Sequence, residues 1–366
     1  MLSNKPMAWT LLQPWDGIDF ERQAEIMDVP GCDAGRSPGS AEYAYGWSQA
    51  TLLFDFYASV APGKPQADLE YHYVHEPFVT DDYVRATYWQ SFLHGLRFSA
   101  FWVWATGQLG SGEAGAGMTD TAWSQPQVGW GTASAALDLR RLAREVAAFP
   151  PPAQAALYFS RPSLYLDDWG YASCLQQTYE ALFFCDTPVG FMTDDMIRAG
   201  KLSGLKLLIV PRADYVEADV RATIARYAEA GGHVLLVGDG LRCDEYRREH
   251  SLALAGPNVT RVEPARPEPL SRMLDARLTA AGVERLVRVR EASGGPAWAV
   301  ECRSVAQGET LLCSLLNLRK ASVEVELLRD GGPVTRWEEL IEGESGTRAT
   351  FRLRPMVPLL LRLGGN

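Results

Sequence analysis

The order of apolar and polar residues divides the chain into three regions, and the first covers about residues 1–150. In this region, short apolar runs that predict strands are separated by amphipathic stretches that predict helices. The four expected strands are residues 7–12, 25–29, 66–71 and 99–104. Because strands that alternate with helices build βαβ units, the region should contain a parallel sheet.

Three helices are expected between or after these strands, at residues 50–59, 81–95 and 133–148. The last helix ends just before a run of three prolines at 150–152. Proline stops a helix because it lacks the backbone N–H that the helix needs. We therefore place a linker, and the end of the first region, at these prolines.

The second region, about residues 153–250, has the clearest alternation of strands and helices. Its elements form the series β-α-β-α-β, which fits an open parallel sheet of the flavodoxin-like kind. In chain order, the expected elements are residues 155–160, 172–185, 205–210, 216–230 and 233–237.

The third region is predicted to be a small antiparallel β domain. After a helix at residues 270–282, the pattern changes to short runs in which apolar and polar residues alternate, with glycine-rich turns between them. The expected strands are residues 297–302, 310–316, 323–328, 350–353 and 357–361. The predicted domains are therefore residues 1–150, 151–285 and 286–366.

Charge and composition narrow the possible functions. The chain has 35 Lys and Arg against 45 Asp and Glu, and its net charge of −10 disfavours binding to nucleic acid or to an anionic membrane. No apolar run approaches the roughly 20 residues that a membrane-spanning helix requires. The six cysteines are scattered, which argues against a disulfide scaffold or a zinc knuckle and favours a reducing, cytoplasmic compartment. We expect no metal and no cofactor.

Two possible sites are better explained by structure than by chemistry. His72 and His75 are three residues apart, which places them on opposite faces of a strand, and no third metal ligand has a suitable spacing. A class I amidotransferase would have the sheet order expected for the second region. That enzyme needs a Gly-x-Cys-x-Gly turn, and neither Cys174 nor Cys185 has one.

The most informative stretch is the strand at 66–71, which carries Glu70 near its end and is followed by a helix and a strand that ends with Trp102 and Trp104. This arrangement is typical of the carboxyl-terminal rim of a glycosidase barrel. At that rim a carboxylate attacks the anomeric carbon, and an indole gives the sugar an apolar face. By spacing alone, an equally good reading makes Glu70 a solvated acid and the tryptophans core residues.

These residues resemble the family 42 glycoside hydrolases, which are β-galactosidases with a trimerisation domain. The most specific segments are Lys64-Pro65 through Glu70, Trp89-Gln90 through His94-Gly95, and residues 205–210 leading into 216–232. In that family, a barrel is followed by an amidotransferase-like trimerisation domain and then by a small β domain. The three regions of this chain follow the same order.

The resemblance implies roles for individual residues. It places Glu70 at the position of the catalytic nucleophile and Trp104 at the end of the eighth barrel strand. Asp33 resembles a residue at the end of the sixth strand. The substrate-binding residues expected on this basis are Trp102, Trp104, His72 and Asp33.

The chain also departs from the family pattern. The family's general acid/base is a glutamate that follows an asparagine, and no Asn-Glu pair occurs in these 366 residues. A complete (β/α)₈ barrel needs about 250 residues, whereas about 150 precede the trimerisation-like region. We therefore expect the C-terminal portion of such an enzyme, a partial barrel with the last four βα units, from a truncated gene, a fragment or a split protein.

The expected function is hydrolysis of a β-galactoside or a related glycoside with retention of configuration, in a form that lacks its acid/base. The expected partners are a carbohydrate substrate and further copies of this chain, as a homo-oligomer that is most simply a trimer. The alternative is a non-catalytic oligomerisation or carbohydrate-binding protein derived from such an enzyme.

Overall fold

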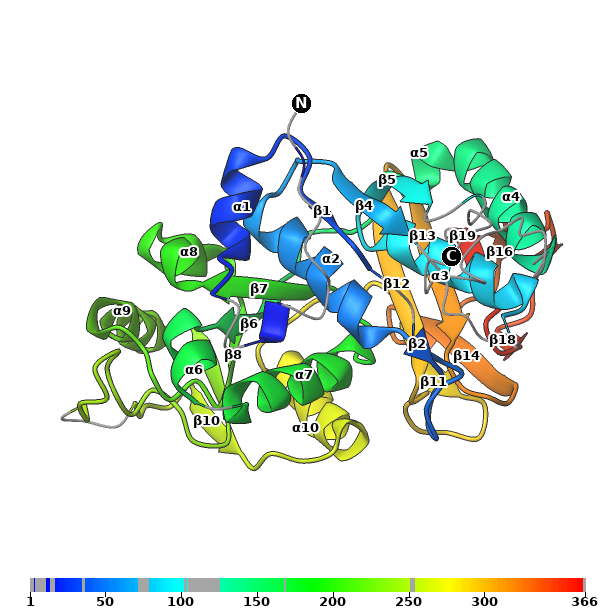
Figure 1. Cartoon of the computed structure of the whole chain (residues 1–366). Helices are drawn as coiled ribbons and strands as arrows, with labels where there is room; N and C mark the ends of the chain where they lie inside the picture. Colours follow the sequence, from blue (N-terminus) through cyan, green and yellow to red (C-terminus); the bar gives the residue numbers. More distant parts are fainter. Residues whose placement is uncertain are drawn as a thin grey trace.

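The structure is a computed structural model that describes residues 3, 11–13, 17–34, 37–71, 79–101, 104, 126–167, 169–250 and 254–364. These residues form a three-stranded parallel sheet, a five-stranded parallel sheet, two antiparallel sheets and a short two-stranded sheet (Figure 1). The two-stranded sheet pairs β2 (Ser37–Pro38) with β3 (Tyr45–Gly46). The protein is thus a mixed α/β protein, as the pattern of the chain predicts.

The first sheet has three parallel strands in the order β1-β4-β5. They are β1 (Gly31–Cys32), β4 (Gln66–Tyr71) and β5 (Leu96–Phe101). The predicted strand at 66–71 is confirmed residue for residue, whereas the strand predicted at 99–104 begins earlier, at Leu96. Most of the strand predicted at 7–12 lies outside the described residues.

Helices flank these strands along the chain. Helix α3 begins where the sequence supplies a cap, because Oγ1 of Thr80 accepts a hydrogen bond from the backbone N–H of Tyr83 at 3.1 Å. Asp81 and Asp82 add negative charge to its first turn, which the helix dipole favours. The helices are α2 (Ser48–Val60), α3 (Asp81–Leu93), α4 (Pro126–Arg141) and α5 (Ala143–Val146).

The strand predicted at residues 25–29 is wrong, because Phe20–Ile26 form helix α1 instead. Asp19 starts this helix, since its carboxylate accepts a hydrogen bond from the backbone N–H of Arg22 at 3.0 Å. The polar residues after Phe20 then continue a helix that buries one face. An N-terminal cap has therefore outweighed a short apolar run.

The second sheet has five parallel strands in the order β10-β9-β8-β6-β7. Counted along the chain from β6, the order is that of flavodoxin-like sheets, with the second strand at one edge beside the first, so the predicted sheet type is confirmed. The strands are β6 (Ala155–Phe159), β7 (Val189–Thr193), β8 (Leu207–Pro211), β9 (His233–Val237) and β10 (Val259–Val262).

The pattern of the chain does not predict β7 or β10. Strand β7 contains Gly190, and a Cβ there would lie 2.8 Å from the Cβ of Ala153 and 3.1 Å from the carbonyl oxygen of Ala155. Glycine is therefore required where β7 lies against β6, although glycine weakens the strand signal. Strand β10 has no fully buried residue, so it lacks the apolar run that marks the other strands.

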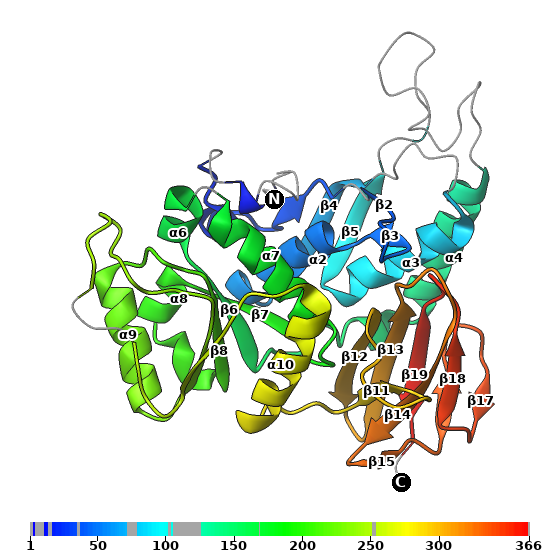
Figure 2. The same ribbon diagram turned by 90° about the horizontal axis from the view of Figure 1, so that it is seen from below.

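Helices cover both faces of this sheet (Figure 2). Helix α7 packs against α10 on one face, and α8 packs against α9 on the other. None of the helices in the described part of the chain is long and apolar enough to cross a membrane. The helices are α6 (Arg161–Leu166), α7 (Gly170–Phe183), α8 (Asp194–Arg198), α9 (Ala218–Glu229) and α10 (Pro267–Ala280).

Two antiparallel sheets share one core near the C-terminus. One has the order β12-β13-β19-β16-β17, and the other has β11-β14-β15 with β18 paired to β14. Apolar and acidic residues alternate along β14, which buries its apolar side. The strands are β11 (Arg288–Glu291), β12 (Val300–Gln307), β13 (Thr310–Asn317), β14 (Val323–Arg329), β15 (Gly332–Pro333), β16 (Trp337–Glu339), β17 (Ser345–Gly346), β18 (Thr350–Leu353) and β19 (Leu359–Leu363).

A cluster of buried charged side chains joins these parts of the protein. His94 follows α3, with Nδ1 2.7 Å from Oδ1 of Asp55 on α2 and Nε2 2.8 Å from Oε1 of Glu301 on β12. Arg303, also on β12, places Nη1 3.2 Å and 3.0 Å from the two ring nitrogens. The hydroxyl of Tyr179 on α7 donates to Oδ2 of Asp55 at 2.8 Å. Four elements therefore meet at one buried point, which we call the His94 cluster.

The His94 cluster brings buried groups of opposite charge together. The guanidinium of Arg303 lies 3.6 Å from a carboxylate oxygen of Asp55 and 4.0 Å from one of Glu301, and the ring of His94 bridges the same two carboxylates. Such pairing is what allows charged groups to be buried.

The buried Asp186, in the loop after α7, should make the stability of the protein depend on pH. The side chain of Asp186 is 9% exposed, and burial raises its pKa to about 7. Its contribution to stability is therefore full below the ordinary value of 3.8 and is lost as the pH rises to about 7. The free energy of unfolding of Asp186→Asn should equal that of wild type near pH 4 and exceed it by about 1–4 kcal/mol at pH 8, since one pKa unit corresponds to about 1.4 kcal/mol. Urea unfolding at both pH values measures the difference.

Asp330→Asn provides a matched control for Asp186→Asn. Both aspartates have a left-handed backbone, with φ of 51° at Asp330 and 54° at Asp186, and asparagine tolerates that conformation. The side chain of Asp330 is 82% exposed, so its substitution should not change the pH dependence of stability. A stability difference between Asp186→Asn and wild type that is the same at both pH values would contradict the prediction.

Candidate functional site

Three carboxylates gather at one edge of the β1-β4-β5 sheet. Because the strands are parallel, their carboxyl ends meet at the same edge. Strand β1 leads into Asp33 there, and β4 carries Asp68 and Glu70. In parallel barrels and open parallel sheets, this edge is where ligands bind and catalytic residues lie.

Asp68 connects the strands at this edge. Its side chain is fully buried, and Oδ1 accepts hydrogen bonds from the backbone N–H of Ala34 at 3.4 Å and of Glu70 at 3.3 Å. The first donor follows β1 and the second lies in β4, so Asp68 fixes the backbone of Glu70 relative to the neighbouring strand. Asp68 was not among the residues predicted from the sequence, where its one signal is its position two residues before Glu70 in a strand.

The pairing of β4 with β5 is irregular next to Glu70. Asp68 pairs with Ser99 and Tyr71 pairs with Phe101, so β4 uses one residue more than β5 between these pairs. A bulge of this kind redirects side chains and is common beside active sites. The direction of the half-buried Glu70 side chain is therefore set by a local feature that no alternation of residues predicts.

Helix α3 supports the end of β4. Tyr71 is fully buried, and its ring centroid lies 4.5 Å from that of Tyr88 on α3. The hydroxyl oxygen of Tyr88 lies 3.3 Å from Oγ of Ser99 in β5. These contacts attach the end of β4, next to Glu70, to α3 and to β5.

The structure places some of the predicted site residues and not others. Glu70 is half-buried near the end of β4, and Asp33, just after β1, is 5% exposed. Because β1 and β4 are parallel, both residues lie at the carboxyl edge of the sheet. Trp104 follows β5 and is 67% exposed, which leaves most of its ring surface open. Trp102 and His72 lie outside the described residues.

The flavodoxin-like sheet makes a cysteine nucleophile worth testing. Cys174 on α7 is buried, and this burial raises its pKa to about 11. Burial likewise raises the pKa of Cys185 well above its ordinary value. A thiol that stays protonated is a poor nucleophile, so neither residue is suited to amidotransferase chemistry. Among the described residues, no group of three or more His, Cys, Asp or Glu is arranged to hold a metal ion.

No family model and no curated protein sequence matches this chain. Solved structures match it closely in fold. An exo-carrageenase of glycoside hydrolase family 42 from Bacteroides ovatus has a TM-score of 0.82 at 19% identity, over 98% of this chain and 51% of its own. A catalytic mutant of a family 42 β-galactosidase from G. stearothermophilus has a TM-score of 0.78 at 14% identity, over 99% of this chain and 63% of its own.

The β-galactosidase from Rahnella sp. R3 has a TM-score of 0.77 at 14% identity, over 98% of this chain and 63% of its own. These matches confirm the resemblance to family 42 glycoside hydrolases. At such low identity they establish the fold and not the activity. The chain spans about half to two thirds of the length of the solved structures it matches, which is consistent with the C-terminal portion of such an enzyme.

The position of Asp68 predicts its effect on stability. Asp68→Ala should lower the free energy of unfolding by about 1–3 kcal/mol, because it removes the hydrogen bonds that Oδ1 accepts from the backbone N–H groups of Ala34 and Glu70. Asp68→Asn keeps an acceptor oxygen at nearly the same volume and should recover most of the loss. Urea unfolding of the three proteins measures both effects. An Asp68→Ala variant as stable as wild type would show that this carboxylate does not hold the edge together.

Proposed function

We propose that this chain is a glycoside hydrolase-like protein in which residues 1–150 form part of a (β/α)₈ barrel. The observation that carries the proposal is the position of Glu70 at the carboxyl edge of a parallel sheet, with its backbone held by the buried Asp68. The fold shared with family 42 enzymes supports it. Residues 151–285 are then a trimerisation-type domain, and residues 286–366 are a C-terminal β domain.

In this proposal, Glu70 is the nucleophile in a retaining hydrolysis of a β-galactoside or a related glycoside. Its carboxylate attacks the anomeric carbon while the leaving oxygen takes a proton from a carboxylic acid, and water then releases the sugar from Glu70. Trp102 or Trp104 provides the apolar surface on which the sugar stacks. His72 and Asp33 bind sugar hydroxyl groups.

The second carboxyl group of this mechanism is the part that the chain does not supply. A retaining hydrolase holds its two carboxyl groups about 5–5.5 Å apart. The family's acid follows an asparagine, and these 366 residues contain no Asn-Glu pair. General acid catalysis contributes roughly 10²–10⁴-fold to the rate, so the chain alone should be a poor enzyme on natural substrates.

One side of the first sheet is suited to receive further βα units. Among the described residues, no strand pairs with the outer edge of β5. Phe98 on β5 is 56% exposed, and Trp130 and Leu137 on α4 are 72% and 67% exposed. Trp130 and Leu137 are seven residues apart and so share one face of the helix. The unpaired edge of β5 and the exposed apolar residues of α4 support the proposal of a partial barrel, because further βα units could cover such surfaces.

The absence of an Asn-Glu pair favours a second candidate function. A protein that lacks the general acid of the family can keep the fold and act as a non-catalytic oligomerisation or carbohydrate-binding protein. The complete five-stranded flavodoxin-like sheet fits that function equally well. The two candidates differ in whether Glu70 performs chemistry, and substitution of Glu70 therefore separates them.

Glu70→Gln should abolish the turnover of activated glycosides. An aryl galactoside with a good leaving group needs little help from an acid, so the wild-type chain should hydrolyse it slowly while leaving lactose almost untouched. Glutamine has nearly the volume of glutamate but cannot form the glycosyl ester, so activity should fall to background. Release of the aryl alcohol, followed by absorbance, measures the rate.

Glu309→Gln is the control, because Glu309 is an exposed acid in the turn between β12 and β13. Its activity should equal that of wild type. Unchanged turnover in Glu70→Gln would place the nucleophile elsewhere, and a wild type without any turnover would favour the non-catalytic candidate. Rapid hydrolysis of lactose by the pure chain would show that it contains an acid that the family motif does not reveal.

We also propose that the chain self-associates as a trimer through residues 151–285. Light scattering at micromolar concentration should then report three times the 40.3 kDa mass of one chain. Soluble protein at 40.3 kDa alone would refute self-association. Exposed strand edges also promote aggregation, so large insoluble species would not count as support.

A further inference from the structure

The loops that follow β6, β8 and β9 meet at the carboxyl edge of the five-stranded sheet, because these strands are parallel. We call this surface the flavodoxin-like edge and define it as Trp169 after β6, residues 212–215 after β8 and residues 238–250 after β9. The order of the strands along the chain reverses between β6 and β8. In open parallel sheets, the carboxyl side of such a reversal is the usual place for binding.

Backbone strain is concentrated at the flavodoxin-like edge. Among the described residues, eight that are not glycine have a left-handed backbone, and four of these lie at this edge. They are Trp169 with φ of 74°, Arg212 with 44°, Leu241 with 60° and Arg247 with 65°. Residues with a Cβ rarely adopt this conformation, and those that do cluster at functional sites. The strain therefore points to a role of this edge beyond the stability of the sheet.

Backbone hydrogen bonds join the two larger loops of the edge. The N–H of Leu241 donates to the carbonyl oxygen of Ala213 at 2.7 Å, and the N–H of Cys243 donates to that of Asp214 at 2.9 Å. In the other direction, the N–H of Val216 donates to the carbonyl oxygen of Cys243 at 2.9 Å. The loops after β8 and β9 thus form one ordered surface, so binding a partner costs little conformational entropy.

Arginines face outward at the flavodoxin-like edge, above the acids that pair with them. In three ion pairs, the arginine side chain is 49–73% exposed and the acid side chain is 10–18% exposed. Arg247 adds a fourth exposed arginine, whereas the exposed acids of the edge are Asp239 and Glu249. Accessible positive charge therefore prevails here, on a chain whose net charge is −10. The pairs are Arg212–Asp167, Arg242–Asp214 and Arg248–Asp244.

Two exposed aromatic rings lie beside these arginines. Tyr246 is 67% exposed, and its ring centroid lies 4.8 Å from Cζ of Arg248. Trp169 is 42% exposed, and a Cβ on the next residue, Gly170, would lie 2.9 Å from Cζ of Arg212. Tryptophan, tyrosine and arginine are the residues that contribute most to binding at protein–protein interfaces. The composition of the edge is therefore that of an interface.

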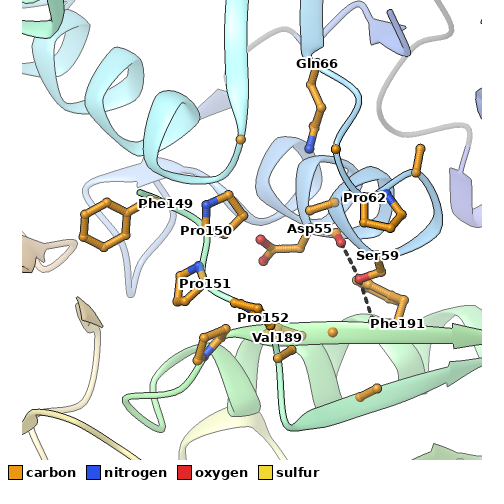
Figure 3. Close-up of a pocket in the computed structure, with 18 of the residues that line it drawn as sticks. Asp55, Ser59, Pro62, Gln66, Phe149, Pro150, Pro151, Pro152, Val189 and Phe191 are labelled. Atoms are coloured by element: carbon orange, nitrogen blue, oxygen red, sulfur yellow. Dashed lines mark hydrogen bonds between the residues drawn. The ribbon is translucent and has the colours of Figure 1, made fainter. Parts of the chain in front are cut away.

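The first region already covers this sheet at its other side, along β7. The N–H of Phe191 in β7 donates to Oγ of Ser59 on α2 at 2.9 Å. Figure 3 shows α2 and the prolines at 150–152 beside Val189 and Phe191, around a cavity of about 620 Å³. Strand β6 separates β7 from β8 and β9 in the sheet. The contact with the first region therefore leaves the loops after β8 and β9 exposed.

We propose that the flavodoxin-like edge is the surface through which one copy of this chain binds the next. The proposal rests on the self-association through residues 151–285 proposed above, and it names the contact that this self-association uses. A closed trimer with cyclic symmetry joins two different surfaces at each interface. Because the chain as a whole is negatively charged, a surface with outward arginines on one copy is complementary to acidic surface on the next.

Two substitutions at exposed positions test the edge by light scattering of the full chain over a series of concentrations. Tyr246→Ala removes an exposed ring, and Arg247→Glu reverses an exposed charge. Each should raise the midpoint concentration of dissociation at least tenfold, and the double variant should have the 40.3 kDa mass of one chain at micromolar concentration. An increase from about 50 to about 500 mM NaCl should weaken the association of wild type more than that of Arg247→Glu.

Lys201→Glu and Trp130→Ala are the matched controls. Lys201 is exposed and precedes β8, so it lies at the amino edge of the same sheet, and its substitution changes the charge as much as Arg247→Glu does. Trp130 is a 72% exposed ring on α4 in the first region. Both controls should associate like wild type. Circular dichroism checks that every variant is folded.

Hydroxyl-radical footprinting locates the contact without any substitution. The oxidation of Trp169 and Tyr246 should fall at least threefold between dilute, dissociated protein and concentrated, associated protein. The oxidation of Trp130 should not change. Equal oxidation of Trp169 and Tyr246 in both states would place the interface elsewhere and overturn the proposal.

The outcomes separate this proposal from the broader one. If wild type associates and both edge variants associate equally well, or if the controls lose as much affinity as the edge variants, the edge is not the interface although self-association stands. Wild-type protein at 40.3 kDa alone would refute self-association and the edge together. None of these measurements depends on turnover at Glu70.

Discussion

The contact of His94 with two buried carboxylates fixes the relative placement of the main parts of this protein. Asp55 belongs to α2, His94 follows α3, and Glu301 belongs to β12 of the C-terminal sheets. Each charge costs several kcal/mol to bury without a partner, so any arrangement that separates one of these groups is disfavoured. Apolar packing alone is less selective, because it tolerates shifts that a set of short, directed hydrogen bonds does not.

This constraint reaches the candidate site through β4. The strand follows α2 and precedes α3, so the helices on both sides of it along the chain are attached to the same cluster. Glu70 lies near the carboxyl end of β4. The proposed catalytic carboxylate is thus carried by a strand whose neighbouring helices along the chain are both attached to the His94 cluster.

Patterns along the sequence predict those elements that interactions between neighbouring residues determine. The strands at 66–71, 233–237 and 350–353 have the predicted bounds, because alternating apolar residues mark the first and the last of them and an apolar run marks the second. The strand predicted at 25–29 is wrong because Asp19, the residue that starts the helix found there, lies outside the apolar run. The role of Asp68 depends on Ala34, a residue 34 positions away, and no pattern along one strand contains that information. The same limit applies to the His94 cluster, whose members are separated by up to 248 positions.

The buried Asp68 also bears on the choice between a catalytic and a purely structural origin. Burying a carboxylate carries a desolvation cost, and Asp68 offsets it in part with two long hydrogen bonds, at 3.4 Å and 3.3 Å. An apolar residue would serve a sheet edge that only had to be stable. One of those two bonds holds the backbone of Glu70 beside a bulge that directs its side chain. A buried carboxylate that holds the backbone of a second one is what the proposed catalytic role of Glu70 would require, and this arrangement is the local support for that proposal.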